Sequence, residues 1–248
     1  MTAQELKRNQ RNLADQTPKR ILRAAIREFS AHGLFGARME AIAESAGANK
    51  ALLYYYFKSK KGLYEAALEE VSGTVVENAL AALDARYSAG ERLLRTALNH
   101  FDRILTQHEF QSLMQQEMVR FRRGEGGSMP VMYRTAFEPL MEKLRTAVEE
   151  GVRSGELCKV DWQQVMYSIF GVNVFYFLSA PMVQMALKFE PLDADVLRSR
   201  RKAVAQFLGN ALFVDRARGA KLAARVLAAM PMPEVKKLQV RRKAYERA

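Results

Sequence analysis

The chain has 248 residues, of which 49% are hydrophobic and 27% charged, the composition of a globular protein with a well-filled core. Its single cysteine, Cys158, excludes an intramolecular disulfide and a multi-cysteine zinc site, and the three histidines are too widely spaced for a ligand pattern, so we expect no metal and no cofactor. The net charge of +12 favours a polyanionic partner, either nucleic acid or a membrane surface.

The positive charge is concentrated at the two ends of the chain. Residues 1–61 carry twelve Lys or Arg against five Asp or Glu, and residues 215–248 carry ten against three. The segment between them carries seventeen against nineteen and is close to neutral. We find no apolar run of membrane-spanning length and no signal-peptide core, so we expect a cytoplasmic protein that does not enter a membrane.

The first elements are a polar arm and an amphipathic helix. Residues 1–16 are poorly patterned and are expected to form a flexible arm, either reaching along a nucleic-acid backbone or merely solubilising. Thr17 and Pro18 form a good helix start, with Thr as N-cap and Pro at the first helical position. Apolar residues then recur at helical spacing until His32 and Gly33, where we expect the helix to end.

Two short helices follow with a tight turn between them. The first is predicted over residues 39–46, and Gly47 breaks it; the second is predicted from about Asn49 to Tyr56. Ser59 then caps a fourth helix. Two short helices around a glycine turn, preceded by a supporting helix, form a helix-turn-helix, here over about residues 38–57.

The rest of the chain is also predicted to be helical. Segments are expected over residues 92–107, 110–121, 131–152, from Asp161 to a kink or end at Pro181, 192–213, and 215–230. No convincing strand or internal repeat is present. The fold class is therefore all-α, with a small N-terminal domain at 17–68, a larger domain at 69–214 that brings the count to about nine to ten helices, and a basic helix and tail at 215–248.

The stretch from Thr17 to Leu68 resembles the helix-turn-helix of the TetR/AcrR-type family of bacterial transcriptional regulators. The resemblance is carried by Ile42-Ala43, Ala46-Gly47, the run LYYYF at 53–57, Ser59-Lys60 and Leu63. It implies a DNA-binding domain followed by a variable helical domain for effector binding and dimerisation. One departure is that Arg38-Met39-Glu40 stands where the family often has Thr or Ser, so either Arg38 replaces that phosphate contact or the cap is lost.

The run of tyrosines can then be assigned to DNA contact. The N-terminal part of the second helix of such a motif enters the major groove, so Asn49, Lys50 and Ala51 are placed to reach base edges, with Tyr55 near a thymine methyl. The resemblance implies phosphate contacts by Tyr54 and Tyr56, and Lys60 adds a charged one at the start of the next helix. The full predicted set is Arg38, Met39, Glu40, Asn49, Lys50, Ala51, Tyr54, Tyr55, Tyr56 and Lys60.

A small-molecule site is expected in the larger domain. Its candidate lining is an apolar, thioether-rich set, although such residues also form plain core: Phe101, Phe110, Met114, Met118, Met132, Phe137, Met166, Phe170 and Asn173. Asn173 lies within a very apolar run, so its amide either binds a ligand or pairs with backbone. The effector is expected to be largely apolar.

A homodimer is expected because helix-turn-helix proteins commonly read two-fold symmetric operators. The late helices carry more apolar residues than one internal face needs, and the predicted interface is Val174, Phe177, Leu178, Val204, Phe207, Leu208 and Leu212. A thick monomeric core is the alternative.

These observations together predict a ligand-responsive, sequence-specific DNA-binding transcriptional regulator, and the family's habit implies a repressor that leaves a palindromic operator in double-stranded DNA when a small molecule binds. We find no nucleophile elbow, Walker loop or HExxH motif, so an enzyme is not expected. The alternative is a basic helical protein that binds anionic membrane surfaces or nucleic acid non-specifically.

Overall fold

The computed structural model describes residues 3–125, 127–187 and 189–234. These residues form eleven α-helices and one π-helical turn, and among them there is one isolated bridge, Leu157 with Phe213, but no strand. The predicted all-α class is confirmed. The part of the basic tail from residue 235 onward lies outside the described residues.

The chain divides into two compact units. The N-terminal unit comprises residues 1–75 and 107–137, and the C-terminal unit comprises residues 76–106 and 138–248. Residues 107–137 therefore pack with the helix-turn-helix, although the sequence assigned them to the larger domain.

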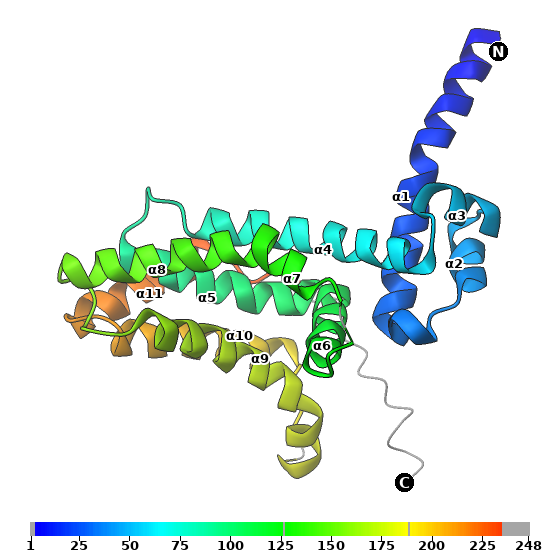
Figure 1. Cartoon of the computed structure of the whole chain (residues 1–248). Coiled ribbons are helices and arrows are strands. Elements are labelled where there is room, and N and C mark those ends of the chain that lie inside the picture. The colour runs from blue at the N-terminus through cyan, green and yellow to red at the C-terminus, as the bar shows by residue number, and fades with distance from the viewer. Residues whose placement is uncertain (1–2, 126, 188, 235–248) are drawn as a thin grey trace. The chain divides into compact units, whose positions relative to one another are not determined.

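The N-terminal unit contains α1 (Ala3–Gly36), α2 (Met39–Ala46), α3 (Lys50–Phe57) and the first part of α4 (Lys60–Ala82), and also α6 (His108–Arg122), α7 (Met129–Met132) and the π-helical turn η1 (Tyr133–Phe137). Figure 1 shows α2 and α3 packed beside α1. One apolar cluster joins them, built around the fully buried Ile21, Phe29, Ile42, Leu53 and Leu63.

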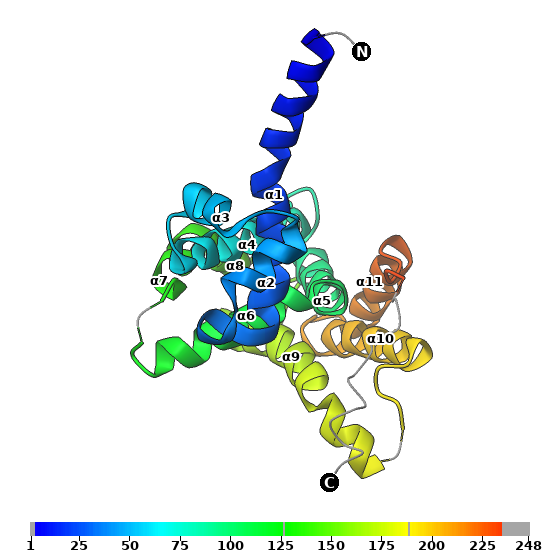
Figure 2. The same ribbon diagram turned by 90° about the vertical axis from the view of Figure 1, so that its right-hand side faces the viewer.

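The C-terminal unit contains the remainder of α4 together with α5 (Ala89–Thr106), α8 (Glu138–Arg153), α9 (Trp162–Leu187), α10 (Ala194–Ala211) and α11 (Arg216–Ala229). Figure 2 shows α10 and α11 running next to each other. Their approach is close because two glycines meet there: a Cβ on Gly219 would lie 2.0 Å from the carbonyl oxygen of Gly209. Most of the predicted helices are confirmed within a few residues, and so is the cap by Ser59. Asp161 and Asp215 also cap the helices that follow them.

Two sequence expectations about the helices are wrong, and a third is met in part at most. Helix α1 starts at Ala3 and contains Pro18, so residues 3–16 are helical; this segment is rich in Ala, Glu, Gln, Leu, Lys and Arg, which favour helix. At Pro181, where the sequence predicts a kink or an end, α9 does not end but runs on to Leu187. The helix expected over 131–152 is instead interrupted by η1, so that α8 begins at Glu138.

The expectation that the chain has no apolar run of membrane-spanning length is also wrong. Helix α9 is long and apolar enough to do so, judged by length and composition alone, because no Asp, Glu, Lys or Arg occurs between Trp162 and Leu187. Of the 18 consecutive residues that make up its most apolar part, only 22% are buried within the chain. Several large apolar residues of α9 are exposed: Tyr167, Phe175, Leu178, Met182, Met185 and Leu187.

Candidate nucleic-acid interface

Helix α2 is fixed by its apolar face and by the glycine after it. Met39, Ile42, Ala43 and Ala46 are buried in the core of the N-terminal unit. Gly47 adopts the left-handed conformation (φ 59°, ψ 41°), which only glycine takes without strain, and its N–H donates to the carbonyl oxygens of Ala43 and Glu44. The turn toward α3 therefore starts at a defined angle.

An arginine from α1 holds this turn. The guanidinium of Arg20 donates to the carbonyl oxygen of Ala46 (3.1 Å from Nε and 2.8 Å from Nη2) and to that of Gly47 (2.9 Å). A cation at the C-terminal end of a helix also complements its dipole. Arg27, two turns further along α1, donates to Ser45 Oγ at 3.2 Å. Neither contact could be predicted from the sequence, because each arginine is far along the chain from the residue that it contacts.

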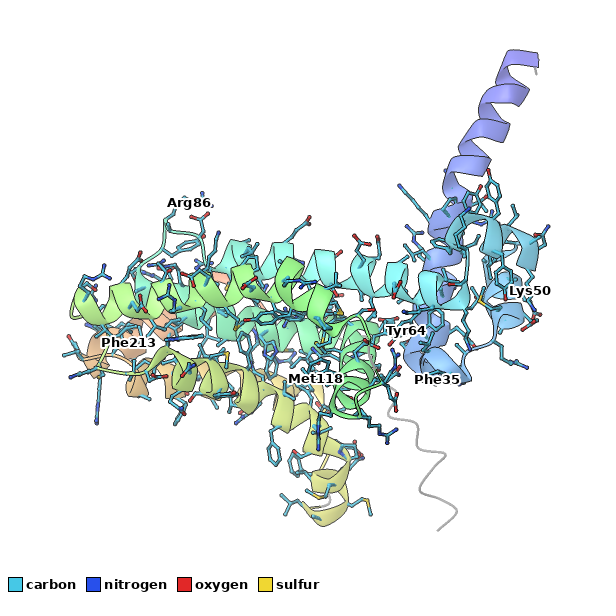
Figure 3. All side chains as sticks on the ribbon, in the orientation of Figure 1. Phe35, Lys50, Tyr64, Arg86, Met118 and Phe213 are labelled. Carbon is cyan, nitrogen blue, oxygen red and sulfur yellow. The ribbon has the colours of Figure 1, made fainter. Side chains whose placement is uncertain are left out.

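The next helix, α3, has one buried anchor and a largely exposed outer side. The side-chain oxygen of Asn49 caps it by accepting from the N–H of Leu52 at 2.9 Å. Leu53 is fully buried, whereas Lys50 and Ala51 are exposed. Asn49, predicted to contact DNA, thus has its oxygen engaged in the cap. Figure 3 shows Lys50 at the outer edge of the α2–α3 pair.

Lys50 is paired with a carboxylate of the preceding helix. Its ammonium donates to Glu40 Oε1 across the turn. This hydrogen bond raises the pKa of Lys50 and lowers the pKa of Glu40 from their usual ranges, with the opposite charge of the partner acting in the same direction. Both side chains are about half exposed or more, so water and salt screen the pair. Its main effect is to hold Lys50 in one direction.

The tyrosines of α3 have different surroundings. Tyr54 and Tyr55 are 41% and 69% exposed, whereas Tyr56 is half-buried against the core. The rings of Tyr55 and Tyr56 meet edge to face at 5.1 Å between centroids, and the ammonium of Lys58 lies 5.6 Å from the Tyr55 centroid. Aromatic side chains therefore face outward beside positive charge.

Lys60 and Met39 differ from their predicted roles. The ammonium of Lys60 donates to the carbonyl oxygen of Phe35 at the end of α1 (3.0 Å), so this lysine also ties α4 to α1. Met39 is 5% exposed and packs in the core, so its side chain cannot contact DNA and its predicted contact is wrong. The side chain of Arg38 makes no capping hydrogen bond to α2, while its backbone N–H donates to Glu28 Oε1 at 3.0 Å.

A buried carboxylate in α6 accepts a hydrogen bond from the first part of α4. Glu117 in α6 is fully buried and accepts hydrogen bonds from the Tyr64 hydroxyl (2.9 Å), from Arg120 and from the backbone N–H of Ser128 (3.0 Å). Burial, reinforced by the Glu117 charge, raises the pKa of Tyr64. Figure 3 labels Tyr64 in the first part of α4. The sequence gives no local signal for this network, since Tyr64 and Glu117 are 53 residues apart.

The predicted ligand-lining residues do not form one cluster. Some belong to the core of the N-terminal unit or lie against it: Phe110, Met114, Met132 and Phe137. Met118, in the same unit, is 53% exposed. Met166 and Phe170 pack against the main core of the C-terminal unit, Phe101 is buried in a smaller cluster there, and Asn173 is fully buried.

The predicted dimer residues also separate. Val204, Leu208 and Leu212 are buried in the core of their own chain, so they are not available to a partner, which corrects the prediction for these three. Leu178 and Phe207 are 62% and 61% exposed, and Val174 and Phe177 are half-buried.

The sequence reading missed a larger exposed stripe on α9. Its members recur at intervals of three and four residues and therefore share one face: Tyr167, Gly171, Phe175, Leu178, Met182 and Met185. A similar face of α10 carries Ala203, Phe207 and Ala211, followed by Val214 just after the helix.

Comparisons with known proteins agree with this geometry. Residues 21–67 match the family described as bacterial regulatory proteins of the tetR family, and residues 90–208 match a tetracyclin repressor-like C-terminal domain. The Escherichia coli HTH-type transcriptional regulator RutR is 29% identical over 167 residues, which are 67% of this chain and 76% of RutR. The Streptomyces coelicolor HTH-type transcriptional repressor SCO4008 is 45% identical over 56 residues, 23% of this chain and 29% of that protein.

Solved structures share the fold. The Bacillus subtilis transcriptional regulator FadR, in complex with stearoyl-CoA, has a TM-score of 0.55 at 19% identity and covers 75% of this chain and 96% of its own.

Proposed function

Because the chain belongs to the TetR family of bacterial regulatory proteins and is a ligand-responsive DNA-binding regulator, we propose that it is a homodimeric, cytoplasmic repressor that a small molecule releases from a palindromic operator. The observation that carries this proposal is the exposed side of α3, where Lys50, Tyr54 and Tyr55 face outward from a helix that is anchored by Leu53. The turn that leads into this helix is held by Arg20.

The proposed docking places the start of α3 in the major groove. Lys50 donates to guanine O6 and N7, and Ala51 and Tyr55 meet thymine methyl groups. The phosphate contacts are assigned to the hydroxyls of Tyr54 and Tyr56 and to two cations, Arg38 and Lys60. Glu40 directs Lys50 rather than touching DNA, because a carboxylate is repelled by the phosphate backbone.

A second copy of the chain is proposed to cover the apolar stripes of α9 and α10. A helix face of aromatic, Leu and Met side chains costs free energy when it remains in water. Gly171 has no heavy atom within 4 Å of a built Cβ, so it gives a second helix room to approach. Two-fold pairing through α9 and α10 would also match a palindromic operator.

The effector is proposed to be largely apolar. FadR was solved with stearoyl-CoA, a molecule with a long acyl chain, and it shares the fold of this chain. The candidate lining residues kept in this proposal are those of the C-terminal unit, Phe101, Met166, Phe170 and Asn173.

The experiment that tests the function is selection of bound fragments from random duplex DNA, repeated at low and physiological salt. Recovery of one two-fold symmetric motif at the higher salt would support the proposal. Sequence-independent binding that disappears with salt would overturn it. The basic ends and the apolar α9 would then favour a membrane-surface protein, for which binding to anionic liposomes is the test.

Two variants test the assigned contacts on the selected operator. Lys50→Ala is expected to weaken binding to the operator more than to scrambled duplex, because it removes a base contact. Lys60→Ala is expected to weaken binding to both and to lower the slope of log affinity against log salt by about one unit. Variants that bind the operator as tightly as the parent would contradict this placement of α3.

A further inference from the structure

Asn173 is a polar residue on the buried face of an apolar helix. The buried positions of α9 are Val165, Ile169, Asn173 and Ala180, and Asn173 is 0% exposed. An apolar side chain would fill this position without the loss of hydration that a buried amide incurs. The amide must therefore make hydrogen bonds, or it must serve a ligand.

The amide nitrogen is fully used, and this fixes the orientation of the side chain. Nδ2 of Asn173 donates to the carbonyl oxygen of Ala97 in α5 at 3.0 Å and lies 3.3 Å from Nδ1 of His100. A carbonyl oxygen only accepts, so the amide group cannot be turned over. The second N–H of Nδ2 then points at Nδ1 of His100, which places the histidine proton on Nε2.

The amide oxygen of Asn173 has no hydrogen-bond donor among the described residues. Oδ1 of Asn173 is buried and accepts no hydrogen bond from any residue that the structure describes. Buried polar atoms in folded proteins nearly always have a partner, so this acceptor is open to a donor from another molecule, either a water or a ligand. A ligand that supplies an N–H or O–H would satisfy it.

The imidazole beside the amide is uncharged and packs among aromatic rings. Burial, and secondly the charge of Arg103, lowers the pKa of His100 to about 3, so this imidazole is neutral. The His100 ring meets the Phe170 ring edge to face at 4.7 Å. One helical turn beyond Asn173, Phe177 packs against Phe101 at 5.1 Å between centroids. The oxygen is therefore offered among aromatic side chains that suit an apolar molecule.

We propose that Asn173 Oδ1 is the polar recognition point for the effector and that it accepts a hydrogen bond from an N–H or O–H of an uncharged, largely apolar small molecule. His100 is a positioning residue. Its Nδ1 accepts the second N–H of the Asn173 amide, and this contact keeps Oδ1 of Asn173 pointing away from the imidazole ring. This inference rests on the proposed function, since it names the chemical class of the molecule to which the regulator responds.

The test compares two probes of similar shape, phenol and anisole, on the full-length protein. Phenol can donate a hydrogen bond and anisole cannot. Affinities are measured by titration while the Asn173 side-chain amide is followed by NMR. We expect phenol to bind about five- to tenfold more tightly than anisole, the range for one hydrogen bond to a buried acceptor, and to shift the Asn173 amide signal. Benzoate is expected to bind more weakly than phenol.

Asn173→Leu should remove the preference for phenol, whereas Ile169→Val, a change on the same buried face that leaves the amide intact, should keep it. If Asn173→Leu does not fold, Asn173→Met fills the same space with a flexible apolar chain and is expected to give the same result. Equal affinities of the parent for phenol and anisole would show that water satisfies Oδ1 and would overturn the inference. A preference that survives in the folded apolar variants, or tighter binding of benzoate, would overturn it as well.

The same preparations are titrated with the selected operator. Sequence-specific DNA binding without any phenol preference would reject the role of Asn173 and leave the proposed regulator intact. A phenol preference that depends on Asn173, in a protein that binds DNA without sequence preference, would reject the proposed function and leave the polar site.

Discussion

At the scale of single residues, the candidate DNA interface depends on side chains that hold one another. Lys50 is exposed enough to reach a base, yet Glu40 fixes its direction from across the turn. A lysine has many rotamers, and restricting them before DNA arrives lowers the entropy lost on binding. The same carboxylate repels phosphate, so it also weakens binding to any DNA sequence.

Glu40→Gln is therefore expected to raise affinity for scrambled duplex a fewfold and to lower the preference for the operator. Both affinities can be measured by fluorescence anisotropy at one salt concentration. Glu44→Gln is the matched control, because Glu44 is an exposed acid on the same helix and no described ion pair joins it to Lys50. If the two variants behaved alike, the effect would be one of net charge and not of the direction of Lys50.

His100 predicts how stability depends on pH. Its pKa is about 3 in the folded chain and about 6.5 when unfolded, because burial among apolar side chains, together with Arg103, disfavours the proton. The folded state therefore binds fewer protons, and its stability falls as the pH drops below 6.5. Between pH 7 and pH 5 this one group should remove about 2 kcal/mol of unfolding free energy.

Urea titration at both pH values measures that loss, and in His100→Gln the loss should be smaller by about this amount. His108→Gln, the same replacement at an exposed histidine, is the matched control. A parent whose stability is the same at pH 7 and pH 5 would contradict the neutral, buried imidazole.

At the scale of elements, helix boundaries could be predicted where a single residue sets them. Gly47, Asn49 and Ser59 are local signals, so α2, α3 and the start of α4 were placed within one or two residues. The start of α1 was not, because Thr17-Pro18 resembles a helix start although the chain before it also favours helix.

Contacts between distant residues could not be predicted. The bonds from Arg20 to Ala46 and from Tyr64 to Glu117 depend on how helices cross, which no local pattern records. The same limit explains the dimer residues: apolar spacing identified two faces of α10 but did not show that Val204 and Leu208 belong to the inner one.

The crossing of α10 and α11 gives a prediction at this scale. Gly219→Ala is expected to lower the free energy of unfolding by about 1–3 kcal/mol, because the added methyl meets the Gly209 carbonyl oxygen and Phe213. Gly73→Ala is the control, since that helical glycine has open space and should gain up to about 1 kcal/mol. Chemical denaturation of the parent and both variants measures the free energy of unfolding. If Gly219→Ala were as stable as Gly73→Ala, α10 and α11 would be able to move apart at little cost.

At the scale of the whole molecule, the exposed stripe of α9 should determine the oligomeric state. Phe175→Glu places a carboxylate in the middle of that stripe, where a dimer would bury it without a partner, and is therefore expected to give a monomer. The monomer should be folded, with helical content like the parent's, because Phe175 is 67% exposed and contributes little to the core. Lys202→Glu, an exposed change on the opposite side of α10 from Phe207, should stay dimeric. Sedimentation equilibrium distinguishes the two, and a dimeric Phe175→Glu would assign the dimer to another surface.

A surface of this kind also ties the lifetime of the protein to its abundance. Helix α9 has no charged residue over 26 positions, so its exposed apolar face favours aggregation unless a second copy of the chain covers it. By mass action, the dimeric fraction falls as the protein concentration falls. Uncovered chains are substrates for chaperones and proteases. A cell that makes few copies would lose them faster than one that makes many, so the gene for this regulator would show a threshold of expression below which no repression is maintained.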